Sequence, residues 1–157
     1  MKYLSACLAT VFCLGLLSAA HASSAKDNVG TVLTKIDVKY IKHKPEKTIG
    51  QPMIVEFWAT WCPPCRASIP HLNEIYKKYK DKGLVVIGIT DENDNVVEKF
   101  MKQIPMDYAV AQDKDDDWSK QFGIKGIPHA MLVDKSGKIV WEGHPMQIDE
   151  KEIEKLL

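Results

Sequence analysis

Cys62 and Cys65 lie three positions apart with only Pro63 and Pro64 between them, and their type and spacing point most directly to chemistry. A cysteine pair at this spacing can be a structural disulfide, part of a metal site, a haem attachment site or a reversible dithiol/disulfide couple. Each alternative makes a different demand on the rest of the chain. The neighbouring residues therefore decide between them.

The local sequence disfavours three of these four alternatives. Haem attachment needs a histidine directly after the second cysteine, and this chain has Arg66 there. A structural zinc site needs four ligands, but the histidines after residue 22 are scattered singly, at positions 43, 71, 129 and 144. A structural disulfide is weakly motivated, because closing so short a loop removes little entropy from the unfolded chain. The residues favour a reversible redox couple. We expect no bound metal.

The first 22 residues are expected to form a signal peptide, which leaves residues 23–157 as the mature domain. Lys2 supplies a short cationic start, residues 4–20 form an apolar run, and Ala20-His21-Ala22 is a small-residue cleavage site. Such a segment directs export, so we expect a periplasmic domain.

Two alternatives for the N-terminal segment stay open. Without cleavage it would anchor the domain in a membrane, although the apolar run is on the short side for a span. Lipid attachment at Cys7 is disfavoured, because most of the apolar run follows this cysteine instead of preceding it. If the segment is removed, Cys7 and Cys13 leave with it, and the mature domain keeps only Cys62 and Cys65.

The composition indicates a single globular domain without a charge-driven partner. A chain of 157 residues with 45% apolar side chains can bury a core of its own. The 21 basic and 21 acidic residues balance, so no net field would recruit nucleic acid or an anionic membrane surface. We therefore expect no nucleic-acid partner.

A buried strand and an amphipathic helix are predicted on either side of the cysteines. Residues 53–58 form an apolar run with Glu56 as its one charge, and apolar residues after Cys65 recur at helical spacing. The two intervening prolines suit the first helical turn, where their missing N–H groups have no intrahelical partner to lose. A sulfur at a helix N-terminus lies at the positive end of the macrodipole, which favours thiolate. We therefore expect Cys62 to be the nucleophile and Cys65 the resolving cysteine.

The segment WATWCPPC, residues 58–65, resembles the active-site segment of the thioredoxin superfamily. With GQPMIVEF before it and IPHAMLVDKSGKIVW at residues 127–141, the chain is similar to periplasmic thiol-disulfide oxidoreductases of the TlpA/ResA/DsbE type. This resemblance implies a thioredoxin-like α/β fold, a mixed central sheet flanked by helices. It also implies protein thiol or disulfide substrates, no cofactor and a membrane thiol-disulfide electron donor. We expect a monomer.

The resemblance also assigns roles to residues away from the cysteines. Glu56 falls where thioredoxins keep a buried acid beneath the redox pair, and Ile127-Pro128 falls where they keep a cis-proline facing it. A carboxylate in an apolar strand is expected to have a raised pKa and to relay the proton of Cys65. The backbone beside Ile127 would offer a strand-like edge to a substrate peptide. The alternative for Glu56 is an ion pair with a buried lysine.

Two tryptophans and a histidine flank the predicted site. Trp58 and Trp61 are expected to shield the redox pair, with Trp61 on the substrate side, and plain core packing is the alternative for either. His129 follows Pro128 and is interpreted as a pH-sensitive neighbour of the cysteines or as a surface histidine. Ser68 departs from the narrower family, many of whose members carry a glutamate near the second cysteine.

The remaining chain is predicted to complete the α/β fold. Periodicity indicates strands near residues 36–40, 84–90, 106–111, 130–134 and 138–141, and helices near 96–103, 115–122 and from 149 onward. The acidic run at residues 115–117 is interpreted as a helix cap. Between Cys65 and Pro128 the chain has one helix and one strand more than a plain thioredoxin needs. This extra segment resembles the insertion of the TlpA/ResA type before the cis-proline loop.

Three functions stay open from the sequence. The first is disulfide reduction on protein substrates, toward which the resemblance tilts. The second is donation of the disulfide by an oxidant to folding clients. The third is Cu(I) binding by the two thiolates with or without His129, because soft sulfur ligands favour Cu(I). A peroxidase of the peroxiredoxin type is disfavoured, because its Thr-x-x-Cys is here Thr60-Trp61-Cys62.

Overall fold

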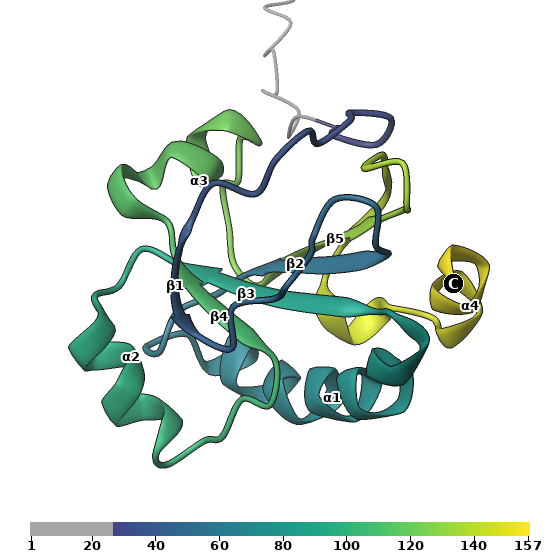
Figure 1. Ribbon diagram of the computed structural model, residues 1–157. Helices are drawn as coiled ribbons and strands as arrows, with labels where there is room; N and C mark the ends of the chain where they lie inside the picture. The colour runs from purple at the N-terminus through teal and green to yellow at the C-terminus, as the bar shows by residue number, and fades with distance from the viewer. Residues whose placement is uncertain (1–26) are drawn as a thin grey trace, which may run out of the picture.

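The computed structural model describes residues 27–157, and the predicted signal peptide lies outside the described residues. Within that range the chain forms one six-stranded sheet in the order β1-β4-β3-β2-β5-β6. The strands are β1 (Lys39–Lys42), β2 (Met53–Phe57), β3 (Val85–Thr90), β4 (Ala109–Gln112), β5 (His129–Val133) and β6 (Ile139–Gly143). Figure 1 shows β2 and β3 at the middle of this sheet.

The sheet is mixed, as the sequence predicted. Strand β2 pairs in parallel with β3, and β3 pairs in parallel with β4. Strands β1, β5 and β6 each run antiparallel to their neighbours. All five residues of β2 are buried, which explains the apolar run in the sequence. Strand β2 leads directly into the loop that carries Cys62.

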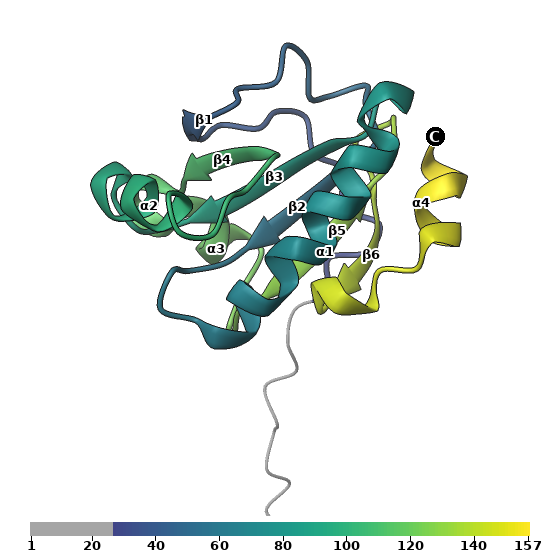
Figure 2. The same cartoon turned by 90° about the horizontal axis from the view of Figure 1, so that it is seen from below.

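Helices cover both faces of the sheet (Figures 1 and 2). The α-helices are α1 (Pro63–Tyr79), α2 (Asp94–Met101), α3 (Asp117–Gln121) and α4 (Glu150–Leu156), and 3₁₀ turns lie at Lys80–Lys82, Lys114–Asp116 and Pro145–Gln147. Buried residues of α1, α2 and α4 share one core with Ile54 and Trp58. Buried residues of α3 share the other core with Met53, Val55 and Phe57. Side chains alternate along a strand, so Glu56 points into the layer beneath α1.

Helix α1 begins as the sequence indicated. Cys62 is its N-cap residue, with an extended backbone, and the two prolines occupy the first helical positions. A buried stripe of Ile69, Leu72 and Ile75 faces the sheet, while basic residues fill the last turn. No helix among residues 27–157 is both long enough and apolar enough to cross a bilayer.

Two predicted strands begin three residues later than expected. The strand near 36–40 is found at Lys39–Lys42, and the one near 106–111 at Ala109–Gln112. Apolar residues before each strand misled the prediction, because they are buried or partly buried without pairing: Ile36, Val38, Met106 and Tyr108. Strand β1 is also an edge strand whose register shifts between Tyr40 and Lys42.

The predicted helices also differ at their ends. The helix expected at 96–103 begins two residues earlier and spans Asp94–Met101. The one expected at 115–122 is a 3₁₀ turn followed by the short α3, and Asp115 and Asp116 have left-handed backbone angles. The cap at α3 comes from Asp113 instead of the acidic run, because its carboxylate accepts the backbone N–H groups of Trp118 and Ser119. The prediction placed this cap on the wrong aspartates.

Candidate active site

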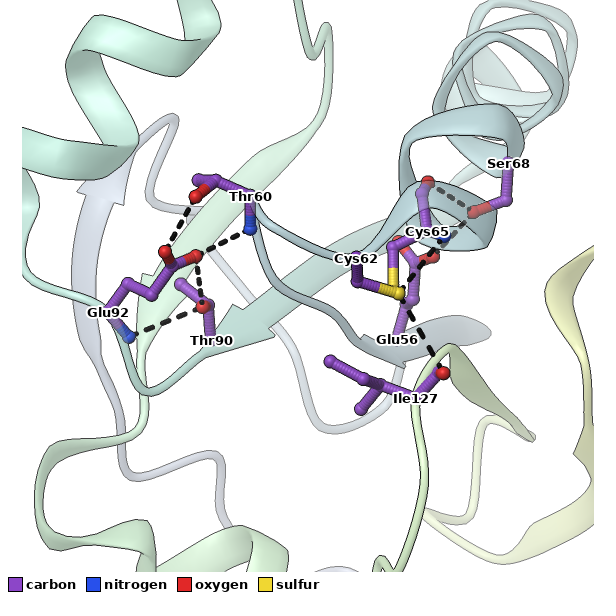
Figure 3. The surroundings of a disulfide bond; sticks show 8 residues. All are labelled: Glu56, Thr60, Cys62, Cys65, Ser68, Thr90, Glu92 and Ile127. Carbon is purple, nitrogen blue, oxygen red and sulfur yellow. Dashed lines mark hydrogen bonds between the residues drawn. A yellow bond between two sulfur atoms is a disulfide. The ribbon is translucent and has the colours of Figure 1, made fainter.

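The two cysteines form a disulfide at the junction of β2 and α1, with Cα atoms 5.3 Å apart. The Cys62 Sγ also accepts the backbone N–H of Cys65 at 3.3 Å, as Figure 3 shows. This amide belongs to the first turn of α1, whose other early N–H positions are prolines. In the reduced protein the same amide and the positive end of the helix would stabilise a thiolate on Cys62.

The cysteine pair is nearly closed off from solvent. Cys62 is 3% exposed and Cys65 is fully buried, whereas the neighbouring Trp61 is 68% exposed. The carbonyl oxygen of Ile127 lies 3.8 Å from Cys62 Sγ, and the Ile127–Pro128 peptide bond is cis. The exposed Trp61 and the backbone of Ile127 are therefore the neighbours of Cys62 on either side of the disulfide.

Glu56 is the buried acid beneath this pair. It is completely buried, and this burial raises its pKa from 4.5 to about 8, against the opposing effect of hydrogen bonds from two hydroxyls. Ser68 Oγ lies 3.0 Å from one carboxylate oxygen and Tyr108 OH lies 3.4 Å from the other. No ion pair to Glu56 occurs among residues 27–157, so the lysine partner considered as an alternative is not what the structure places there.

Ser68 has one hydroxyl proton and two acceptors within reach. Its Oγ lies 2.8 Å from the Cys65 carbonyl oxygen as well as 3.0 Å from Glu56 Oε1. If Glu56 is ionised, Ser68 can donate to only one of these oxygens. If Glu56 is protonated, its O–H donates to Ser68 and Ser68 donates to the Cys65 carbonyl, so that all three groups are satisfied. Burial is what raises the pKa of Glu56 to about 8 and keeps it mostly neutral near pH 7, since the Ser68 hydrogen bond lowers that pKa.

The two tryptophans have different surroundings. Trp58 is 2% exposed, belongs to the core beneath α1, and has its ring centroid 5.4 Å from that of Phe100. It also covers Gly88, where a Cβ would approach Trp58 Nε1 to 2.9 Å. Trp61 instead stands on the surface beside Cys62. The structure thus gives Trp58 a packing position and leaves Trp61 exposed at the entrance to the disulfide.

His129 is the first residue of β5, directly after the cis-proline. Its Nε2 lies 3.2 Å from Glu142 Oε2, and Glu142 also accepts the backbone and side-chain N–H groups of Asn28. Burial raises the pKa of Glu142, whereas these contacts lower it, and the net effect is a lowered pKa. His129 is therefore part of a cluster that ties the N-terminal described residues to the cis-proline loop.

Glu92 belongs to the site, and the sequence analysis missed it. Its carboxylate accepts both the backbone N–H and the hydroxyl of Thr60, each at 2.6 Å, and lies 3.4 Å from the Thr90 hydroxyl (Figure 3). Thr60 and Glu92 are far apart in the chain, and no local pattern links them. Tyr108 was missed for the same reason, and Ser68 was noticed only as a departure from the family. Among residues 27–157, no three His, Cys, Asp or Glu side chains are placed to share a metal ion.

Comparisons with known proteins agree with this fold and site. The redoxin family model matches residues 23–157. Thiol-disulfide oxidoreductase ResA of Bacillus thuringiensis subsp. konkukian is 38% identical over 118 residues, which cover 74% of this chain and 67% of the relative. A candidate thiol:disulfide interchange protein DsbE from Chlorobium tepidum is 32% identical with a TM-score of 0.61, covering 68% of this chain and 79% of that one.

A further solved structure is the thioredoxin domain of a thiol-disulfide oxidoreductase from Bacteroides vulgatus. It is 26% identical with a TM-score of 0.69, and the match covers 82% of this chain and 98% of that domain. The mixed sheet and the paired cysteines at the start of α1 define a redox protein of the thioredoxin superfamily. The chain belongs to the redoxin family and is a thiol-disulfide oxidoreductase of the ResA/DsbE type.

Proposed function

We propose that the protein is an exported, periplasmic reductase of protein disulfides that acts through Cys62 and Cys65. The observation that carries the proposal is the position of Cys62. Its sulfur caps a helix N-terminus, faces the Ile127 backbone and lies above a buried acid, Glu56. The predicted signal peptide and the similarity to ResA support export and reduction.

The first step is attack of the Cys62 thiolate on one sulfur of a client disulfide. A mixed disulfide forms between Cys62 and the client, and the second client sulfur leaves as a thiolate. The client backbone lies along the edge at Ile127 during this step, and the exposed Trp61 covers it from the other side.

The second step is resolution by Cys65. In molecules whose Glu56 is ionised, the carboxylate takes the Cys65 thiol proton, and the resulting thiolate attacks Cys62 Sγ. The client is released as a dithiol, and Cys62 and Cys65 become a disulfide. A carboxyl with a pKa of about 8 can accept and return a proton near neutral pH. Ser68 and Tyr108 orient it from opposite oxygens.

The oxidised enzyme must then be reduced again. Since the periplasm is kept oxidising, the electrons would come from a membrane thiol-disulfide partner. We propose that residues 23–157 work as a monomeric domain after removal of the first 22 residues. An uncleaved segment would keep the same domain at the membrane, next to such a donor.

A redox titration of residues 23–157 tests the proposed direction. Tryptophan fluorescence and thiol counting by alkylation and mass spectrometry would follow the two-electron transition, with Cys62→Ser as the control that should show none. A reductase is expected to titrate nearer to thioredoxin, at about −270 mV, than to a strong oxidant, at about −120 mV. A potential near the oxidant value would overturn reduction, and the absence of a reversible transition would overturn the exchange mechanism.

A further inference from the structure

A groove of about 390 Å³ runs from the redox pair toward α3. Its apolar lining includes Trp61, Ile124 and Ile127, together with Phe57 and Ile89. Trp61 is the neighbour of Cys62, and Ile127 is the residue whose carbonyl lies 3.8 Å from its sulfur. The groove therefore starts where a client bound to Cys62 would have to lie.

The groove is already formed in the absence of a client. Thr90 and Asp91 also line the groove, and Glu92, the next residue, joins the end of β3 to Thr60 through its two 2.6 Å contacts. A Cβ built on Gly126, another lining residue, would meet no atom within 4 Å, so that the backbone edge there is open. A preformed, half-apolar groove with an open backbone edge suits an extended peptide segment.

Three charged residues line the groove: Asp91, Asp116 and Lys125. Among residues 27–157 the structure records no hydrogen bond or ion pair for the Asp91 side chain. The Asp116 side chain lies 3.8 Å from Lys120, and solvent screens this contact because both groups are exposed. The two carboxylates outnumber the one ammonium group, so the lining attracts a positive charge on a partner.

We propose that this groove selects client segments that carry an apolar and a basic residue close to the reacting cysteine, with Asp91 and Asp116 attracting the basic side chain. The apolar side chain lies between Trp61 and Ile124, where it replaces water on both side chains. This inference rests on the proposed exchange reaction of Cys62, and it adds the class of client on which that reaction acts.

The test uses reduced residues 23–157 and three synthetic peptides in which the sequence around one cysteine is Cys-Leu-Arg, Cys-Leu-Ala or Cys-Leu-Glu. Each cysteine carries a nitrothiobenzoate group in a mixed disulfide. The enzyme dithiol supplies two electrons, the peptide thiol and the coloured thiolate are released, and Cys62 and Cys65 become a disulfide. Colour release gives kcat/KM for each peptide. We expect the Arg peptide to react roughly tenfold faster than the Glu peptide at low salt, and the gap to narrow as salt is raised.

The matched variants are Asp91→Asn with Asp116→Asn, and Glu74→Gln with Asp81→Asn. Both pairs remove two negative charges, but Glu74 and Asp81 are exposed residues outside the groove. Asparagine tolerates the left-handed backbone of Asp116, so the first pair should fold normally, as thermal unfolding would verify. We expect only the groove pair to lose the preference for Arg over Glu, while the control pair keeps it.

The outcomes separate this inference from the proposed function. If all three peptides react at equal rates, or if both double variants lose the preference equally, the groove does not select clients by charge, although exchange by Cys62 stands. If none of the peptides reacts, exchange itself is contradicted. If the Cys-Leu-Arg peptide reacts no faster than a matched Cys-Ser-Arg peptide, the groove does not select the apolar residue.

Discussion

Two regions meet at the Cys62–Cys65 disulfide, and each contains a glutamate in a different setting. On the inner side, Glu56 is buried beneath α1, and within residues 27–157 its carboxylate is hydrogen-bonded by the hydroxyls of Ser68 and Tyr108. On the outer side, Glu92 is half-buried and holds Thr60 by its backbone N–H and its hydroxyl. Burial raises the pKa of Glu56 into the range that the proposed proton relay needs, whereas Glu92 holds the loop before Cys62 through hydrogen bonds.

The tryptophans should show the largest difference between the two sides. Trp58→Ala removes a buried ring from the inner core and is expected to cost about 3–5 kcal/mol of unfolding free energy. Trp61→Ala removes an exposed ring and should change stability by no more than about 0.5 kcal/mol. Urea denaturation of both variants measures these values. Equal losses would contradict the assignment of Trp58 to the core and of Trp61 to the surface.

Glu56→Gln should stabilise the oxidised protein, and the effect should depend on pH. In the unfolded chain Glu56 ionises above about 4.5, whereas in the folded protein it keeps its proton up to about 8. The free energy of unfolding therefore falls as the pH rises from about 4.5, and it levels off above about 8. Glutamine does not titrate and still donates to Ser68. Glu56→Gln should therefore raise the free energy of unfolding by about 3 kcal/mol at pH 7 and leave it unchanged near pH 4.

Thermal or urea unfolding across this pH range checks the Glu56 prediction. The matched control is Glu98→Gln, an exposed glutamate on α2. A pH-independent gain would show that Glu56 does not titrate between the two values. The same variant should slow release of the client from the mixed disulfide, because Cys65 loses its proton acceptor.

Glu92→Ala should have a moderate cost, about 1–2 kcal/mol, because it leaves the Thr60 amide without its charged acceptor. The exchange rate should fall as well, since Trp61 and Cys62 follow this loop directly. Glu98→Ala serves as the control at an exposed position of α2. Unchanged stability together with unchanged exchange would show that the outer side does not depend on Glu92.

Ser68→Ala should lower stability by less than Glu92→Ala does, by about 1 kcal/mol. Its hydrogen bond lowers the pKa of Glu56, so without it that pKa should rise above its present value of about 8. The pH profile of client release should shift to higher pH accordingly. Ser136→Ala, which removes a hydroxyl in an exposed turn, should leave the profile unchanged. A shift to lower pH would contradict the geometry around Ser68.

The sequence predicted the parts of the site that depend on local pattern. Cys62, the two prolines and the strand before them lie side by side in the chain, so that periodicity and helix-start preferences place them directly. The mixed sheet followed from the same patterns and from the resemblance. The buried position of Glu56 was also expected, because it is the one charge in an apolar strand.

Contacts between distant segments could not be predicted in this way. Glu92 meets Thr60 only because β2 and β3 are neighbours in the sheet, and Tyr108 reaches Glu56 from the segment before β4. The cap of α3 was placed on the acidic run, since Asp113 acts across five residues that include left-handed positions. Strand ends shifted where buried residues such as Met106 pack without pairing.

The most direct test of the account is to trap the reaction on one sulfur. Reduced Cys65→Ser and reduced Cys62→Ser are each mixed with a peptide disulfide, quenched with acid, and analysed by mass spectrometry with peptide mapping. Attack by Cys62 and resolution by Cys65 predict that Cys65→Ser accumulates a mixed disulfide at Cys62, while Cys62→Ser forms none at a comparable rate. An adduct on Cys65 in Cys62→Ser, formed as fast as the adduct on Cys62, would contradict the roles assigned to the two cysteines.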